Sequence, residues 1–443
     1  MRNKRVIVAG AGASGLIAAG HAAESGADVV LLEKMPVPGK KILISGKTRC
    51  NLTNARELES FIDAYGINGR FLFGAFHHFF RDELLSLLKK YGVNTVTERG
   101  GRIFPVSGDA GDVVRALQAY NSAHGVQIHT GVQITEVQLD GKTVTGVQTK
   151  KEFYPAGAVI LSMGGASYPA TGSTGDGYRI AQAMGHTIVG LRPSLVPLVV
   201  EEIERARSMQ GVSLRNVRLT AYRCPADKID GQPLPVKDSG RGTGRRSSGK
   251  IMIESRMGEM MMTHFGIGGP VTLQMSLPIV DALAEGPVCV SIDLKPALTE
   301  KQLHLRLQRE FDMNPAKSYK HILEAVLPRK MIVPFIEMTD IPPEKKGNQI
   351  TLEERTRLVR TLKSLRFNIV KPLPLHNAMV TAGGIKLDEI DPRTMASRLI
   401  KGLYFCGEIM DIDADTGGYN LQAAFSTGYV AGENAARFAA DNV

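Results

Sequence analysis

Tryptophan is absent from this chain of 443 residues, and only four cysteines are present: Cys50, Cys224, Cys289 and Cys406. They form no CxxC pair and show no zinc-ligand spacing, which argues against a metal centre and favours a reducing compartment. No apolar run approaches the roughly 20 residues that cross a bilayer, so no membrane association is expected. The chain enters a predicted core strand at Arg5, so we expect no signal peptide and a cytoplasmic protein.

Acidic residues are outnumbered, with 44 Asp and Glu against 54 Lys and Arg, and the net charge is +10. Residues 192–373 alone contain 29 basic and 20 acidic residues and therefore hold +9 of this charge. A basic segment in an otherwise nearly neutral chain favours a polyanionic substrate, with a solubilising surface as the alternative. The low aromatic content, 6%, counts against an RNA surface built on base stacking.

The chain begins with a dinucleotide-binding pattern. Residues 5–9 form a short apolar run that predicts a buried strand. The glycines that follow, Gly10, Gly12 and Gly15, have GxGxxG spacing. The first permits a tight turn, the second lets the backbone approach a pyrophosphate, and the third lets a helix over 15–25 pack on the strand. That helix directs the positive end of its dipole at the phosphates.

A second strand, over 28–32, ends in Glu33, where an acid binds the ribose hydroxyls of an ADP moiety. An acid rather than an arginine here favours FAD or NAD over NADP. A loop that includes Asp176 is expected to close over the same half of the ligand, although Asp176 is also a candidate cap for a helix over 177–184. No second GxGxxG follows, so NAD(P)H has no dedicated site in the sequence. We expect it to reach a bound flavin transiently, unless another reductant serves.

The complementary half of this pattern lies at the C-terminus. Residues 406–408 (Cys-Gly-Glu) fit the strand end where the ribityl hydroxyls of FAD are held, with Glu408 or Asp411 as the acceptor. The glycine pair at 417–418 opens a predicted helix over 420–437, whose free N–H groups would face the flavin pyrimidine ring. The two halves must meet to enclose one long ligand, which implies FAD.

The segments between these halves have distinct patterns. Apolar residues at helical spacing predict a helix over 70–92, and alternation over 126–153 predicts a small sheet. Residues 158–163 predict a further strand of the cofactor sheet. Short β-like runs fill 195–296, and the pattern of 298–366 is typical of helices.

More specific motifs are GKKILISG at 39–46, RCNLTN at 49–54, GRIFP at 101–105, THFGIGGP at 263–270 and TAGG at 381–384. Together with the C-terminal block from Gly402, they resemble the BaiN/YhiN-type (RdsA-like) family of FAD-dependent oxidoreductases over nearly the whole chain. One departure is visible, because Lys47 and Thr48 stand where that family usually has a glycine run. This changes the flexibility of the loop and adds a cation beside the expected flavin.

The resemblance implies an α/β fold with an FAD-binding Rossmann-like domain of the glutathione-reductase type, an inserted β-barrel-like domain and a small helical domain. The corresponding bounds are 1–191 and 374–443 for the FAD domain, 192–297 and 367–373 for the β-rich domain, and 298–366 for the helical domain.

Two activities are associated with the family. One is reduction of uridine to dihydrouridine in large-subunit ribosomal RNA, and the other is reduction of a carbon–carbon double bond in dehydro-bile acids. Both add hydride to an alkene conjugated to a carbonyl, so this chemistry is the firmer expectation. Ribosomal RNA is the preferred substrate, a small-molecule enone is the alternative, and a non-catalytic flavoprotein is a third hypothesis.

Such a reaction needs an acid that protonates the α carbon and groups that polarise the carbonyl. Cys50 is the first candidate for the acid, with a packing role near the cofactor as the alternative. The neighbouring Arg49 is expected to lower the pKa of this thiol, which weakens a donor role. Arg49 and Asn51 are candidates to bind the carbonyl or the flavin, or to brace their loop. His264 is a candidate acid or hydrogen-bond donor, or holds its glycine-rich turn.

The remaining candidates fall into groups. Those for cofactor binding are Gly10, Gly12, Ala13, Ser14, Gly15, Glu33, Lys34, Lys41, Ser45, Gly46, Gly164, Gly165, Asp176, Gly407, Glu408, Gly418, Tyr419, Asn420 and Leu421. Those for substrate or RNA are Arg102, Arg241, Arg245, Arg246 and Lys250, the last four in a flexible basic loop. Asp413 and Asp415 have poor metal-ligand spacing and predict an acidic loop. Met257 and Met260–Met262 either line an enone pocket or pack in a core.

Overall fold

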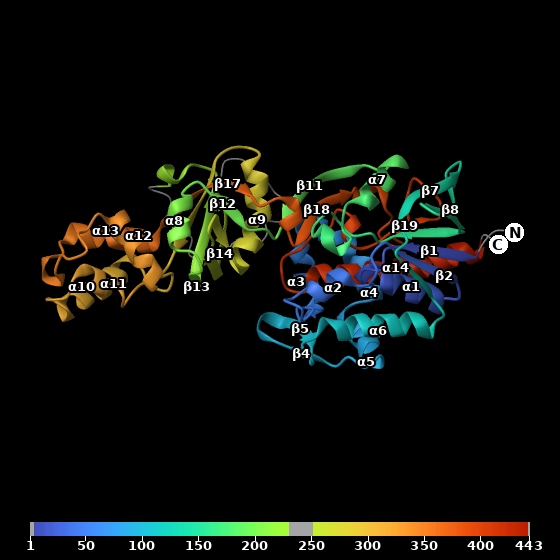
Figure 1. Cartoon of the computed structure of the whole chain (residues 1–443), viewed down its shortest axis with the longest axis horizontal. Helices are drawn as coiled ribbons and strands as arrows, with labels where there is room; N and C mark the ends of the chain where they lie inside the picture. The colour runs from blue at the N-terminus through green and yellow to red at the C-terminus, as the bar shows by residue number, and fades with distance from the viewer. Residues whose placement is uncertain (1–3, 230–250, 442–443) are drawn as a thin grey trace. The chain divides into compact units, whose positions relative to one another are not determined.

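The computed structural model describes residues 4–229 and 251–441, which fall into two compact units (Figure 1). Unit 1 comprises Met1–Ser194 and Leu375–Val443, and unit 2 comprises Leu195–Pro374. Both ends of the chain therefore belong to unit 1, whereas unit 2 is one continuous segment. Its division into a β-rich and a helical domain stays a prediction.

A five-stranded parallel sheet forms the centre of unit 1. Its order is β19-β10-β1-β2-β6, with the bounds Leu403–Phe405, Ala158–Leu161, Arg5–Ala9, Asp28–Glu33 and Gln127–Thr130. The side chains of β1 from Val6 to Ala9 are fully buried, as in strands covered on both faces. Because β19 comes from the C-terminal segment, the sheet is complete only when both ends of the chain contribute. The expected α/β Rossmann-like fold is confirmed.

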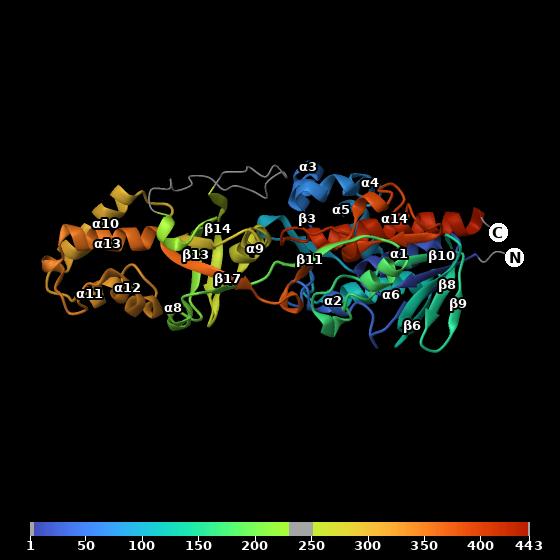
Figure 2. The same cartoon turned by 90° about the horizontal axis from the view of Figure 1, so that it is seen from above.

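Two helices from opposite ends of the chain, α1 (Ala13–Glu24) and α14 (Tyr419–Asp441), lie side by side against this sheet (Figure 1, Figure 2). Glycines allow their close approach. A Cβ built on Gly428 would lie 2.3 Å from Ser14 O, and one on Gly432 would lie 2.4 Å from Ala18 O. The two helices therefore pack backbone against backbone. The bounds of α1 and α14 replace the expected 15–25 and 420–437.

The crossover between β6 and β10 is an antiparallel meander of β7 (Ile134–Asp140), β8 (Thr143–Thr149) and β9 (Phe153–Pro155). The small sheet predicted over 126–153 is therefore present, but its first strand is not part of it. Instead, β6 pairs in parallel with β2, with Val30 opposite Gln127.

Two further sheets complete unit 1. The first has the order β3-β5-β4, with the bounds Thr53–Asn54, Arg102–Pro105 and Thr95–Thr97. The second pairs β11 (Ile188–Ser194) with β18 (Val380–Ile385). These last two strands are where the chain leaves unit 1 and where it returns.

The helical segment predicted over 70–92 is present, but it is not one continuous helix. The structure has a 3-10 helix η1 (Asp63–Leu72), then α4 (Phe73–His78) and α5 (Arg81–Lys90), with an extended residue, Phe79, between them. Phe79 is buried and stacks on Tyr429 of α14, with ring centroids 4.4 Å apart, so a tertiary contact holds the break. The other helices of unit 1 are α2 (Lys40–Ile44), α3 (Leu58–Ile62), α6 (Ala110–Ala123) and α7 (Asp176–Ala183).

Unit 2 contains the expected barrel, closed by six strands in the order β12-β15-β14-β13-β16-β17. Their bounds are Leu198–Val200, Gly266–Gly268, Met252–Met262, Ser213–Tyr222, Val288–Asp293 and Leu365–Pro372. The segment 195–296 is not entirely β, because it also forms α8 (Ile203–Ser208) and α9 (Pro270–Leu283). Pro278 lies inside α9, and this internal proline hides the helix from sequence patterns.

The helices predicted over 298–366 are present. Thr299 and Thr351 begin two of them with capping boxes, in which the threonine side chain accepts an N–H bond from the third helical residue. A buried ion pair of 2.5 Å between Lys363 and Asp293 joins these helices to the end of β16. The bounds are Glu300–Met313 (α10), Tyr319–Leu323 (α11), Ile332–Thr339 (α12) and Leu352–Lys363 (α13).

A buried histidine fastens the connection between β18 and β19 to unit 1. The His186 side chain is fully buried, with Nδ1 3.0 Å from Glu389 Oε2 and Nε2 2.9 Å from Ser397 Oγ. This order of serine, histidine and acid resembles a hydrolase triad. However, Ser397 Oγ also accepts the N–H groups of Leu399 (3.1 Å) and Ile400 (2.9 Å). The group therefore locks a loop and does not present a nucleophile.

The contact between α1 and α14 can be tested by adding one methyl group. We expect Gly432→Ala to lower the free energy of unfolding by about 1–3 kcal/mol, because its Cβ would overlap Ala18 O. This loss exceeds the gain of roughly 1 kcal/mol in helix propensity. Urea unfolding measures it. Gly190→Ala is the control, because a Cβ there meets no described atom within 4 Å. Equal stabilities of Gly432→Ala and the wild type would contradict the packing argument.

The His186 lock predicts a loss of stability on acidification. Burial lowers the pKa of His186 below 6.5, although Glu389 opposes the shift, so the native state favours the neutral ring. The contribution of the neutral His186 ring to the free energy of unfolding is complete above about pH 6.5, and it is lost as the pH falls through the native pKa. We expect the melting temperature of wild type to fall between pH 7 and pH 5, and that of His186→Asn to fall less. The exposed His78→Asn serves as control and should follow wild type.

Candidate cofactor site and active site

The glycine-rich loop after β1 leaves space at its middle glycine. A Cβ on Gly10, which has φ +101°, would lie 2.9 Å from Ser162 O, and one on Gly15 would lie 1.8 Å from Gly10 O. Both glycines are therefore required by contacts within the protein. A Cβ on Gly12, by contrast, would meet nothing within 4 Å in the described part of the chain. The space at Gly12 is therefore open to a ligand.

The N-terminus of α1 faces this space without a protein cap. Gly12 is its N-cap residue, and no side chain in the described part of the protein caps the helix. The first turn of α1 also contains no acidic residue. The first N–H groups of the helix, at Ala13 and Ser14, are thus available to an anion. This geometry fits a pyrophosphate.

Glu33 lies at the end of β2, as the sequence predicts. Its Oε2 accepts the N–H of Ala11 (2.7 Å), and its Oε1 accepts the N–H of Met35 (2.8 Å). These two bonds fix the carboxylate beside the glycine-rich loop. Each oxygen keeps a second lone pair, which suffices to accept a ribose hydroxyl.

An ion pair holds the loop that precedes α7. Lys34 Nζ lies 2.8 Å from Asp176 Oδ2, which also accepts a bond of 3.1 Å from Gln133 Nε2. Burial raises the pKa of Asp176, but bonds from Lys34, Thr174 and Gln133 lower it by more, so its pKa lies below the ordinary value. The expected capping role of Asp176 is wrong, because the N-cap residue of α7 is Gly175 and Asp176 is the first helical residue.

Glu408 connects segments from the two ends of the chain. Its Oε2 accepts Lys41 Nζ (2.7 Å), while its Oε1 accepts the N–H of Thr381 (2.8 Å) and Ser167 Oγ (3.2 Å). Gly165 is required beside this group, because its Cβ would lie 2.4 Å from Thr381 Oγ1 and 3.0 Å from Glu408 Oε1. Glu408 therefore braces the loop of Lys41 as well as being a candidate acceptor for ligand hydroxyls. Thr381 begins the TAGG motif, but neither it nor Ser167 was a candidate site residue from the sequence.

The loop before Cys50 has an unusual backbone. Gly46, Lys47, Thr48 and Cys50 have positive φ angles of 56°, 57°, 66° and 57°. Such conformations are costly for residues other than glycine and gather at functional sites. Lys47 and Thr48 are the two positions at which the resemblance leads one to expect glycine. The loop is also tightly folded, because a Cβ on Gly46 would lie 2.8 Å from Asn51 N.

Cys50 is completely buried within this loop, and burial raises the pKa of its thiol to about 12, although a hydrogen bond with Ser45 opposes the shift. The thiol is therefore protonated at neutral pH. The expected lowering of this pKa by Arg49 is wrong, because the guanidinium is engaged elsewhere. Both of its Nη atoms bond to Glu98, and its Cζ lies 4.3 Å from the ring centroid of Phe104.

Two asparagines tie the same loop to the start of α14. With the Asn51 amide oriented to satisfy both of its atoms, Oδ1 accepts the N–H of Gly418 (3.0 Å) and Nδ2 donates to Thr53 O (3.2 Å). Asn54 Nδ2 donates to Gly417 O (3.1 Å). Gly418 touches Thr53 so closely that its Cβ would lie 2.4 Å from Thr53 O. Of the two roles open for Asn51, the structure shows the loop brace.

The first residues of α14 are held by their neighbours. Tyr419 is buried, and its carbonyl accepts Tyr65 Oη (2.7 Å). Asn420 folds back on its own loop, where Oδ1 accepts the N–H of Ala414 (2.9 Å) and Nδ2 donates to Ala414 O (2.9 Å). Asn420 and Leu421 therefore offer a ligand their backbone and not a free amide.

Several hydrogen-bonding groups in the Cys50 loop and at the start of α14 have no partner within the described ranges of the protein. Thr53 Oγ1 and Gln422 Oε1 are buried and have no partner among the residues that the structure describes. Over the same residues, the backbone N–H groups of Gly46, Lys47 and Asn51 also have no hydrogen-bond acceptor. Buried polar groups are nearly always paired in native proteins. The two buried oxygens therefore fit a polar ligand, such as the ring of a flavin, whereas Gly46 and Lys47 are exposed and their N–H groups are open to solvent.

The remaining candidates lie in unit 2 or outside the described residues. His264 is exposed in the turn between β14 and β15, with its ring edge-on to Phe265 at 4.9 Å. Met260 and Met262 are core residues of the barrel, whereas Met257 and Met261 are exposed. Four basic candidates, Arg241, Arg245, Arg246 and Lys250, lie outside the described residues.

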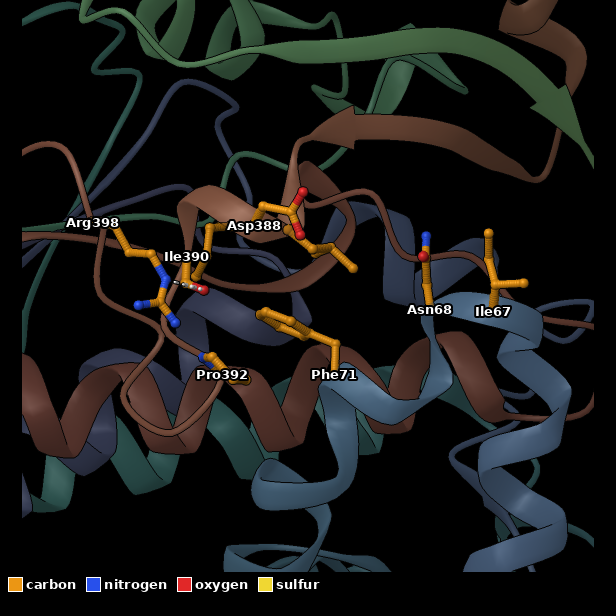
Figure 3. A pocket seen from close by; sticks show the side chains of 8 residues that line it. Ile67, Asn68, Phe71, Asp388, Ile390, Pro392 and Arg398 are labelled. Carbon is orange, nitrogen blue, oxygen red and sulfur yellow. Dashed lines mark hydrogen bonds between the residues drawn. The ribbon is translucent and has the colours of Figure 1, made fainter. Parts of the chain in front are cut away.

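A separate open pocket of about 390 Å³ lies in unit 1 between η1 and the connection from β18 to β19 (Figure 3). Phe71 points into it toward Ile390 and Arg398, and Arg398 Nε donates to Ile390 O at 3.3 Å. Its lining contains no candidate from the sequence. Asn68, which also lines it, donates to Asp411 O (2.7 Å).

Residues 4–229 and 251–441 contain no cluster of three His, Cys, Asp or Glu side chains arranged to hold a metal ion. Asp413 instead accepts a hydrogen bond from Ser194 Oγ at 3.0 Å. Within the same described ranges, no helix combines the length and the apolar character that crossing a bilayer requires.

Comparison with known proteins places relatives along nearly the whole chain. A family model described as the HI0933-like protein Rossmann domain matches residues 4–434. The 3-dehydro-bile acid delta(4,6)-reductase of Clostridium scindens is 32% identical, covering 98% of this chain and 99% of the relative. The ribosomal RNA dihydrouridine synthases of Escherichia coli and Haemophilus influenzae are 27% and 29% identical, with at least 96% of each chain covered.

Solved structures share the fold at low sequence identity. A quinol–fumarate reductase with menaquinol molecules has a TM-score of 0.51 and 17% identity, covering 100% of this chain and 73% of that one. The FrdA subunit of the Escherichia coli quinol fumarate reductase has a TM-score of 0.50 and 18% identity, covering 100% of this chain and 72% of that one.

The space at Gly12 gives a test that separates ligand contact from folding. We expect Gly12→Ala to change the free energy of unfolding of the ligand-free protein by less than about 1 kcal/mol. Its flavin content should nevertheless fall about tenfold or more, because the methyl group occupies the space left for a pyrophosphate. Gly15→Ala is the contrasting variant, since its Cβ clashes with Gly10 O at 1.8 Å and should destabilise the fold itself. Absorbance of bound flavin and urea unfolding measure the two effects, and normal flavin content in Gly12→Ala would contradict the assignment.

Proposed function

The chain belongs to the HI0933-like protein family, and we propose that it is an FAD-dependent reductase of carbon–carbon double bonds conjugated to a carbonyl. One observation carries this proposal. The open, uncapped start of α1 and the start of α14 lie in one unit, and Asn51 ties the protonated Cys50 loop to Gly418. A dinucleotide site and a proton source are thus held together.

The residues present fit FAD along its length. The N–H groups of Ala13 and Ser14 would bind the pyrophosphate, and Glu33 would bind the adenosine ribose. Lys41, Glu408 and the loops of Gly164 and Gly165 would hold the ribityl chain. The start of α14, at Gly418 to Leu421, would place its positive end against the flavin pyrimidine ring.

Bound FAD, when reduced, supplies the hydride, and this chain supplies the other groups. Burial keeps the proton on Cys50 Sγ at neutral pH, and this thiol is the proposed donor of the proton to the α carbon. The N–H groups of Gly46 and Asn51 would polarise the substrate carbonyl as charge develops on its oxygen. Arg49 is a weaker candidate for that role, because Glu98 already binds it.

For the substrate we favour a uridine of large-subunit ribosomal RNA. Two relatives that align with 96% or more of this chain are named ribosomal RNA dihydrouridine synthases. Residues 192–373 carry +9 of the net charge, which suits a phosphate backbone. NAD(P)H is the proposed electron donor, reaching the flavin transiently.

The second candidate substrate is a small-molecule enone. It rests on the 32% identity to the Clostridium scindens bile acid reductase, which exceeds the identity to either RNA-modifying relative. Nucleoside mass spectrometry of ribosomal RNA from cells with and without the protein decides between them. Loss of one dihydrouridine supports RNA, and an unchanged nucleoside profile with turnover of a steroid enone supports the alternative.

The role of Cys50 gives a direct prediction. We expect Cys50→Ala to bind FAD and undergo flavin reduction normally, yet to form product about 10²- to 10⁴-fold more slowly, because the proton donor is missing. Cys289→Ala is a matched control, since Cys289 is also buried, with a raised pKa, but lies in unit 2. Stopped-flow absorbance separates flavin reduction from reoxidation by substrate. Normal reoxidation in Cys50→Ala would leave Cys50 a packing residue.

A further inference from the structure

We propose that four exposed cations of unit 1, Lys47, Arg56, Arg99 and Arg102, form a rim that binds the phosphates flanking the target nucleotide of an RNA strand. This inference rests on the proposed RNA substrate and deepens it. It places RNA contacts beside the Cys50 loop, in addition to the basic segment of unit 2. We call these four residues the cationic rim.

The residues of the cationic rim lie on or near the small sheet β3-β5-β4. Arg102 begins β5 and lies opposite Asn54 of β3, and the N–H of Ala55 donates to Gly101 O at 2.7 Å. Arg56 follows β3 by two residues, and Arg99 precedes β5 by three. Lys47 lies in the loop that leads into β3. Arg102 thus lies on this sheet, Arg56 and Arg99 lie within three residues of its strands, and Lys47 lies six residues before β3.

Ring contacts hold the neighbouring guanidinium groups in place. Arg49 and Arg102 both lie over the Phe104 ring, with Cζ 4.3 Å and 5.9 Å from its centroid. The Arg56 Cζ lies 5.9 Å from the ring centroid of Tyr419, the first residue of α14. Cation–π contacts orient a guanidinium without neutralising its charge.

The rim has more positive than negative charge. Glu98 is bonded to Arg49, and the pKa of its carboxyl is lowered by that bond first and then by the charges of Arg49 and Arg102. Over residues 4–229 and 251–441, no ion pair joins a rim side chain to a carboxylate, and the Nε of Arg102 donates only to Arg99 O (3.2 Å).

The position of the rim links it to the reaction. The segment that it surrounds includes Asn51 and Asn54, which bond to Gly418 and Gly417 at the start of α14. A uridine must leave its base stack before its ring can reach a flavin, so the phosphates on both sides of it come close to the site. Each nucleotide brings one negative charge. A bile acid brings at most one carboxylate and needs no set of four cations.

Matched variants test the rim. The rim variant is Lys47→Gln, Arg56→Gln, Arg99→Gln, Arg102→Gln. The control variant, Lys89→Gln, Lys142→Gln, Lys150→Gln, Lys151→Gln, removes the same charge from exposed positions on α5 and the meander. Each FAD-loaded protein is titrated with deproteinised large-subunit ribosomal RNA over a potassium chloride series. Dihydrouridine formation and flavin photoreduction are measured in the same preparations.

We expect the control to bind like wild type and the rim variant to bind at least tenfold more weakly at 100 mM salt. The slope of log K against log salt should be shallower by about 3 for the rim variant, because each phosphate contact on single-stranded RNA contributes roughly 0.7 to the slope and four contacts are lost. Flavin photoreduction should be equal in all three proteins. Equal losses in the rim and control variants, or no loss in either, would overturn the rim while wild-type dihydrouridine formation keeps the proposed function. Wild type that neither binds nor modifies RNA would overturn both.

Discussion

The backbone contact between α1 and α14 is the constraint on which unit 1 depends. Gly428 and Gly432 press the C-terminal helix onto Ser14 and Ala18, so closely that a methyl group at either glycine would overlap a carbonyl oxygen. This packing fixes the start of α14 relative to the glycine-rich loop after β1. It also accompanies the addition of β19 to the sheet next to β10. The proposed ligand site, divided between residues 10–33 and 407–421, therefore depends on the contact between these two helices.

The position of α14 in turn constrains the backbone of the loop from Ser45 to Asn51. Asn51 and Asn54 bond to the glycine pair that begins α14, and the chain reaches them through four residues with positive φ. The strained backbone buries the Cys50 thiol and leaves N–H groups of the same loop without protein acceptors. Burial favours the neutral thiol, because a thiolate would lose its hydration. In the proposed reaction, this one loop would supply both the proton held on Cys50 Sγ and N–H donors for the developing negative charge.

Sequence patterns predicted the parts of this site that depend on local chemistry. Gly10, Gly12, Gly15 and Glu33 follow from the geometry of a strand, a turn and a helix, and the structure places them as expected. The bond of Arg49 to Glu98 did not follow, because these residues are 49 positions apart and only the β3-β5-β4 sheet brings them together. From the sequence alone Arg49 has only its neighbour Cys50 as a partner, and the pKa shift expected for the thiol on that basis has the wrong sign. Helix α9 was missed for a local reason, since its apolar run and internal Pro278 do not have the pattern of a helix.

Charge in this chain is distributed in two ways that bear on substrate choice. The net charge of +9 on residues 192–373 is spread over a whole segment. The positive electrostatic potential of such a segment raises the association rate with any polyanion, but it does not select one nucleotide. The cations around β3 and β5 are few, and aromatic rings orient Arg56 and Arg102 next to the segment that contacts α14. Oriented charges at short range act on the register of a bound strand and not only on its capture. Both arrangements therefore support the proposed RNA substrate, because a reductase of free enones has no polyanion to capture or to position.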